Sequence, residues 1–98
     1  MEREKIKKLL LKLNFNINSK GFDYWIQAIH LYTTFEKIGM MELYEQLAFE
    51  FMTTKTRIER AMRNAKETAI ENIKTYFEYN NKITNQAILN LIRIKEMK

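Results

Sequence analysis

The feature that most constrains this chain is its lack of helix-breaking residues. Proline is absent, and glycine occurs only at Gly21 and Gly39 in 98 residues. Apolar residues recur at intervals of three and four rather than two, which is the period of helices that bury one face. Because proline and glycine are the residues least compatible with helix interiors, their scarcity allows helices almost everywhere. The sequence therefore predicts an all-α fold, a five- to six-helix bundle, and argues against strands.

The apolar pattern and the capping residues divide the chain into five predicted helices. Ser19, Thr54 and Thr84 each precede an apolar run and can serve as N-caps, while Gly39 ends the turn before another run. Residues 14–20 interrupt the pattern and are expected to form a loop. The predicted helices span residues 2–13, 20–35, 41–51, 55 to about 76, and 85 to about 95.

Composition excludes several classes of protein. The chain has no cysteine, which rules out disulfides, thiolate metal sites and cysteine nucleophiles and suits a reducing, cytoplasmic setting. With 46% hydrophobic residues it should fold as one globular domain over residues 1–98. Neither a phosphate-binding glycine loop nor a catalytic constellation is visible, so no enzyme activity and no cofactor are expected. His30 is a lone histidine, for which a structural role is expected rather than a metal site.

Two further alternatives involve amphipathic segments. The first predicted helix places several lysines opposite its leucines and could lie on an anionic membrane, but a small domain needs that apolar stripe to complete its core. Its N-terminus mixes charged and apolar residues, so neither a signal peptide nor a membrane span is expected. The aromatic residues around Trp25 have helical spacing, which favours core packing over stacking on single-stranded nucleic acid.

The basic character of the chain is local. The formal net charge is +5, and residues 55–66 hold five basic residues against the single acid Glu59, a local net charge of +4. This segment is the start of the fourth predicted helix. A concentrated positive face favours binding to an anionic partner such as nucleic acid. The alternative without a binding function is a basic surface that is simply solvated.

Two predicted helices, over residues 42–51 and 54–70, are joined by a turn too short for antiparallel packing, as in a helix-turn-helix. Ala48 stands where the first helix must be small, and Ile58 stands ten residues later where the second helix buries an aliphatic anchor. Glycine is common four residues after the small position, but this chain has Met52. Because a left-handed backbone would be strained at methionine, a variant turn is expected.

The exposed side of the second helix carries residue types that read DNA. Arginine can donate two hydrogen bonds to guanine, and glutamate can accept one from cytosine. Hydroxyl and lysine side chains near a helix N-terminus suit phosphates, which set register rather than sequence. The predicted base-reading residues are Arg57, Glu59, Arg60 and Arg63, and the predicted phosphate-binding residues are Thr53, Thr54, Lys55, Thr56 and Lys66. No catalytic or metal-binding residue is predicted.

The chain resembles the C-terminal DNA-binding effector domain of the master sporulation response regulator family, stage-zero sporulation transcription factor A. The resemblance covers nearly the whole chain and is most specific at Arg57-x-Glu59-Arg60-x-x-Arg63 in the second helix. The other matching segments are Lys20-Gly21-Phe22-x-Tyr24 with Ala28-Ile29, Leu43-Tyr44-x-x-Leu47-Ala48, Thr53-Thr54-x-Thr56, Ile58, Ala61-Met62-x-x-Ala65, and Lys82-x-Thr84-Asn85.

The resemblance implies a bundle of about six helices and a transcription regulator that binds short G/C-containing boxes of double-stranded DNA. It implies the same four base-reading residues, pairing of two domains on tandem boxes, and contact with the sigma subunit of RNA polymerase. Without the family's receiver domain, the chain is expected to be a stand-alone regulator, monomeric in solution. Its segments between Tyr32 and Leu43 and between Tyr76 and Lys82 are shorter than the family pattern. The alternative is a protein-interaction module that binds the polymerase or a full-length regulator.

Overall fold

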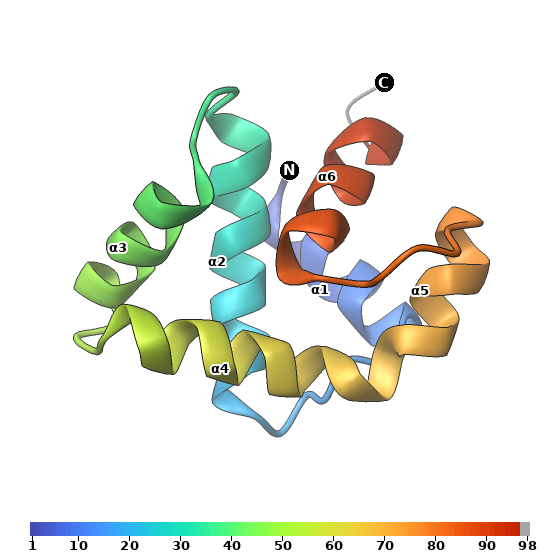
Figure 1. Ribbon diagram of the computed structural model, residues 1–98, viewed down its shortest axis with the longest axis horizontal. Coiled ribbons are helices and arrows are strands. Elements are labelled where there is room, and N and C mark those ends of the chain that lie inside the picture. The colour runs from blue at the N-terminus through green and yellow to red at the C-terminus, as the bar shows by residue number, and fades with distance from the viewer. Residues whose placement is uncertain (97–98) are drawn as a thin grey trace.

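A computed structural model describes residues 1–96, and all its regular elements are helical. Figure 1 shows α4 lying across one side of the molecule, nearly perpendicular to α2, with α3 and α5 at its two ends. The elements are α1 (Arg3–Lys12), α2 (Lys20–Thr34), α3 (Met40–Glu50), α4 (Lys55–Lys66), a 3₁₀ turn η1 (Glu67–Ala69), α5 (Ile70–Phe77) and α6 (Asn85–Glu96). The predicted all-α bundle is confirmed.

The core forms around α2, which packs against α1, α3, α4 and α6. Trp25 is fully buried in this helix, and its ring meets Phe15 edge to face, with the ring centroids 5.4 Å apart. Each surrounding helix contributes the apolar stripe expected from its sequence, including Leu10 in α1, Leu47 in α3 and Ile88 in α6. The aromatic residue at the centre of the pattern is therefore a core residue, as predicted.

The predicted long helix from residue 55 to about 76 is wrong, because the chain bends at η1 between α4 and α5. The loop after α1 holds this bend. The Asn14 side-chain amide donates to the Thr68 carbonyl at 3.2 Å, and the Thr68 hydroxyl donates to the Asn14 carbonyl at 2.7 Å. Ala69 within the bend and Ile73 after it are both fully buried. The bend therefore lets α4 and α5 cover different parts of one core.

The remaining predicted boundaries agree with the structure within a residue or two. Thr84 precedes α6 and its hydroxyl accepts a hydrogen bond from the Ala87 amide at 3.0 Å, as a capping residue should. Ser19 is at the N-cap of α2, but its hydroxyl donates to the Asn16 carbonyl and makes no capping bond. His30 has a structural contact, since its Nδ1 lies 3.1 Å from the Met1 carbonyl oxygen. Within residues 1–96, none of the helices is long and apolar enough to span a membrane.

Candidate nucleic-acid interface

The turn between α3 and α4 joins them as a helix-turn-helix. The Thr53 amide donates to the Ala48 carbonyl at 2.9 Å, and the Met52 amide donates to the Phe49 carbonyl at 3.4 Å. These two bonds satisfy the last carbonyls of α3 in the pattern of a Schellman motif, whose C′ residue has a left-handed backbone. Met52 takes that conformation, with a φ of 53°. The expected variant turn is therefore wrong, because the hydrogen bonds hold methionine in the glycine-like conformation.

The N-terminus of α4 is capped and open to solvent. The Thr54 hydroxyl accepts a hydrogen bond from the Arg57 amide at 3.2 Å, which confirms its predicted capping role. Lys55 and Thr56 are exposed, and Thr53 is half-buried. The Lys55 ammonium lies 3.7 Å from a Glu45 carboxylate oxygen on α3, an exposed pair that costs little to separate. Four of the five predicted phosphate-binding residues thus gather at one end of α4.

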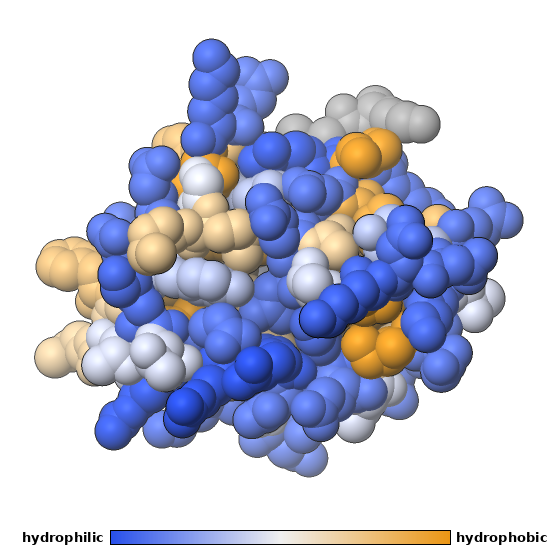
Figure 2. All heavy atoms as spheres, in the orientation of Figure 1, coloured by the Kyte–Doolittle hydropathy of each residue, from blue (hydrophilic) through white to orange (hydrophobic). Residues whose placement is uncertain are grey.

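The three arginines of α4 share its outer surface. Arg57, Arg60 and Arg63 are exposed, and they follow one another at intervals of three along the helix. Glu59 is half-buried beside them, and its carboxylate lies 3.7 Å from Arg63 Nε. Figure 2 shows that hydrophilic side chains cover most of the surface along α4, whereas apolar side chains gather over α3. The structure therefore brings all four predicted base-reading residues to one accessible face.

The inner side of α4 is fixed to the core through its own backbone. Ile58, the predicted aliphatic anchor, is fully buried together with Met62 and Ala65. Trp25 Nε1 donates to the Met62 carbonyl at 2.8 Å, and the Asn16 amide donates to the Ala65 carbonyl at 3.1 Å. Side-chain substitutions on the outer face leave these bonds in place. The helix is consequently a rigid support for its exposed side chains.

Lys66 differs from the other predicted phosphate-binding residues, because it is only 7% exposed. Its ammonium donates to Asn85 Oδ1 at 3.1 Å, and the Asn85 amide nitrogen donates to the Tyr44 hydroxyl at 3.1 Å. Burial lowers the pKa of Lys66 and raises the pKa of Tyr44, since it disfavours the charged form of each group. This network joins α3, α4 and α6 behind the arginine face.

No individual role was predicted for Asn85, which belongs to this network, or for Lys82, which lies beside it. Lys82 and Asn85 line a hollow next to α4 together with Arg63 and Lys66. Both residues belong to the Lys-x-Thr-Asn element that precedes α6. Nothing in the helical periodicity indicates that this element crosses α4, because the connection after α5 is irregular. The resemblance of the element to a family motif was the available signal.

The fold and this face define a helix-turn-helix protein with a basic, solvent-accessible second helix. Residues 6–95 match the family described as "Sporulation initiation factor Spo0A C terminal", and the chain belongs to this family. That family is the DNA-binding domain of a sporulation transcription factor, so the chain is a DNA-binding transcription regulator linked to sporulation. A search among curated proteins finds no significant match.

Proposed function

We propose that the protein binds double-stranded DNA in a sequence-specific manner, with α4 as the recognition helix in the major groove. The observation that carries this proposal is the exposed arginine row on a helix whose backbone is held by Trp25 and Asn16. A helix of this kind fits the major groove, where arginine distinguishes guanine by two parallel hydrogen bonds. A solvated basic face would need neither the row of guanidinium groups nor the rigid support.

Each exposed side chain of the helix has a proposed role. Arg57, Arg60 and Arg63 donate to guanine edges, and Glu59 accepts from a cytosine amino group. The hydroxyl and lysine groups at the start of α4 bind phosphates and fix the register of the helix: Thr53, Thr54, Lys55 and Thr56. The phosphate contact predicted for Lys66 stays a prediction. In the structure the Lys66 ammonium donates a hydrogen bond to Asn85. Its proposed role is to hold α4 against α6.

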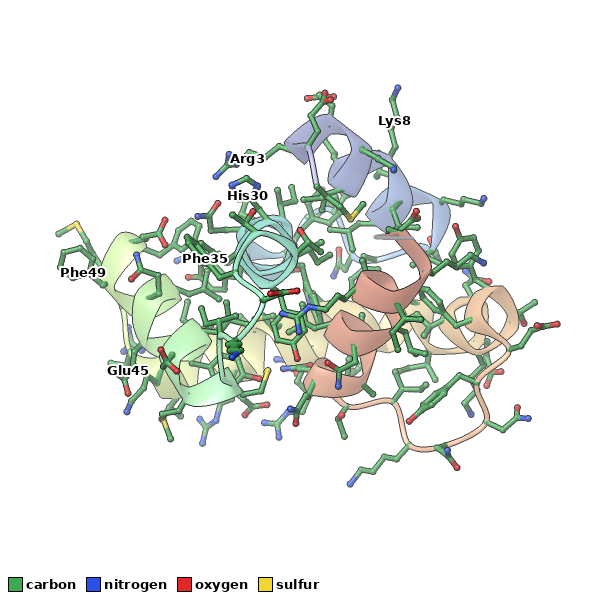
Figure 3. The ribbon with its side chains drawn as sticks, turned by 90° about the horizontal axis from the view of Figure 1, so that it is seen from above. Arg3, Lys8, His30, Phe35, Glu45 and Phe49 are labelled. Carbon is green, nitrogen blue, oxygen red and sulfur yellow. The ribbon has the colours of Figure 1, made fainter. Side chains whose placement is uncertain are left out.

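The experiment is a binding titration on a duplex that carries a box selected by this protein from a random pool. Arg60→Ala and Arg63→Ala should each weaken binding by about 1–3 kcal/mol, because each removes a base-edge donor. Both side chains are exposed, so thermal melts should stay close to that of the wild type. Lys8→Ala is the matched control, since Lys8 projects from α1 on the far side of the molecule (Figure 3).

The result that would overturn the proposal is unchanged affinity in both arginine variants. The remaining alternative would then be a protein-interaction module, for which α4 would be a solvated face. The proposal would also be contradicted if a protein whose thermal melt shows that it is folded selected no box from the pool.

Two further proposals concern partners, and family resemblance supports them. The protein is a monomer in solution that pairs on tandem boxes, and it contacts the sigma subunit of RNA polymerase at activated promoters. Sedimentation of the free protein and titrations on one-box and two-box duplexes test the pairing. A stable dimer without DNA, or equal affinity per site on both duplexes, contradicts it. The polymerase contact is tested by measuring the affinity of Arg60→Ala for purified sigma subunit. An affinity equal to that of the wild type would show that this contact does not depend on the DNA-reading face.

A further inference from the structure

A cavity of about 440 Å³ lies beside α4, where the segment before α6 crosses it. Its inner wall includes Tyr44 and Asn85, which belong to the buried network behind the arginine face. Its charged residues come from α4 and from the crossing segment, and three of the four are basic: Glu59, Arg63, Lys66 and Lys82. The cavity therefore adjoins the proposed base-reading surface and has a positive lining.

The charges of this lining act on one another. Burial is the largest cause of the lowered pKa of Lys66, Glu59 opposes it, and Arg63 and Lys82 lower the pKa further. Arg63, Lys66 and Lys82 all line the cavity, so their positive charges repel one another there. The Glu59 carboxylate forms an ion pair with Arg63, at 3.7 Å from Arg63 Nε within α4. An anion at the cavity would relieve the remaining repulsion.

Lys66 and Lys82 lie at different depths in the cavity. The Lys66 ammonium is bound to Asn85 inside the wall, whereas Lys82 is exposed at the rim. Within residues 1–96, the Lys82 side chain makes no ion pair and no hydrogen bond. Binding an anion there would break no existing interaction, and the long lysine side chain is free to follow it.

α4 is longer than the major groove of DNA is wide. The helix has 12 residues and is about 18 Å long, whereas the major groove is about 12 Å wide. Lys55 is exposed at the first residue of the helix, and Lys82 lies beside its C-terminal half. A helix set in the groove would thus bring one lysine toward each of the phosphate chains that border the groove.

We propose that Lys82 binds a backbone phosphate of the DNA, on the side of the major groove opposite to the phosphates held by Lys55 and its neighbours. This inference rests on the proposed function, because α4 must lie in the groove for Lys82 to reach the backbone. Lys82 binds the phosphate from the rim of the cavity, and Lys66 supports the cavity wall from within.

The first test compares Lys82→Ala with the wild type in titrations over a range of salt concentrations. The variant should lose about three- to tenfold in affinity at 0.1 M salt, and the slope of log K against log salt should become shallower by about 1. A phosphate contact carries no sequence information, so the loss should be equal on the selected box and on box variants with one changed base pair. Lys8→Ala is the control and should change neither quantity.

The second test locates the phosphate. Methylphosphonate linkages, which lack the negative charge, are placed one at a time along both strands of the box. One linkage at the flank of the box should weaken binding of the wild type, and the same linkage should have no effect on Lys82→Ala. Every other linkage should act equally on the two proteins.

The outcomes separate this inference from the function on which it rests. If Arg60→Ala loses affinity while Lys82→Ala keeps the wild-type affinity and salt slope, Lys82 makes no phosphate contact and only this inference fails. If both variants bind as the wild type does, the major-groove placement of α4 fails as well. A loss in Lys82→Ala that depends on the base sequence would also overturn the inference, because it would indicate base reading.

Discussion

Gly21 of α2 lies directly against the backbone of Ala61 in α4. A Cβ atom at Gly21 would overlap the Ala61 carbonyl oxygen and stand 2.8 Å from Ala65 Cβ. One turn later on the same helix, Trp25 donates a hydrogen bond to the Met62 carbonyl. The two residues together fix the distance and the rotation of the proposed recognition helix. The close approach therefore explains why glycine is needed at this position in the first turn of α2.

Gly21→Ala should destabilise the protein and weaken DNA binding. The added methyl group meets main-chain atoms that cannot move independently, so we expect a loss of about 1–3 kcal/mol in the free energy of unfolding. Gly39→Ala is the control, because a Cβ there would meet only the Glu42 side chain at 3.7 Å. Chemical denaturation of both variants measures the difference. Equal stability of the two variants would show that the α2–α4 contact is not as close as the structure has it.

Met52→Gly should stabilise the protein. Met52 is 93% exposed and has a φ of 53°, so its side chain contributes little packing while its Cβ is strained by the left-handed backbone. We expect a gain of about 0.5–1 kcal/mol, since glycine removes the strain but is more flexible in the unfolded chain. Met52→Ala keeps the Cβ and is the control. If the denaturation midpoint of Met52→Gly is equal to or lower than that of Met52→Ala, the backbone at Met52 is not strained.

Part of this architecture follows from local sequence. Thr54 and Thr84 cap helices because a hydroxyl before an apolar run is a local signal, and Ile58 is buried because its helical period places it inward. The bend after α4 depends instead on Thr68 and Asn14, which are 54 residues apart in the chain and exchange two hydrogen bonds. No local pattern contains such a pairing.

The same distinction applies to the candidate site. The exposed arginines could be predicted, since their intervals of three place them away from the anchor Ile58. The burial of Lys66 could not, because it depends on Asn85 in α6, which lies beside α4 only in the folded chain. A lysine in a basic segment is usually solvated, and the sequence gives no sign that this one is covered.

Glu59→Ala should raise affinity for DNA in general while reducing sequence discrimination. The Glu59 carboxylate lies beside Arg63 and repels nearby phosphates, so its removal should strengthen binding to unrelated duplexes. If Glu59 accepts a hydrogen bond from cytosine, one base pair of the box should lose about 1–3 kcal/mol of discrimination. Titrations on the box, on its single-base variants and on an unrelated duplex give both quantities. A variant that keeps full discrimination at every position would exclude Glu59 as a base reader.

The buried Lys66 predicts how stability changes with pH. Burial lowers the pKa of Lys66 in the folded protein below the value of 10.5 of an ordinary lysine. Between the folded and unfolded pKa values, the unfolded chain binds more protons than the folded chain, so the free energy of unfolding rises with pH. The raised pKa of Tyr44 acts in the opposite direction, because stability from this group is lost as the pH rises through 10.0. Measurements below pH 10 therefore isolate the lysine.

We expect the free energy of unfolding of the wild type, relative to that of Lys66→Met, to increase as the pH rises from neutral toward 10. The reason is that the wild type carries a buried ammonium whose desolvation is relieved as it loses its proton, whereas methionine has no such group. Urea denaturation at several pH values measures the difference. Repeating the comparison in a Tyr44→Phe background removes any remaining titration of the phenol. A difference that is constant over this range would show that Lys66 is solvated in the folded protein, and the Lys66–Asn85–Tyr44 network would then not be the link between α4 and α6.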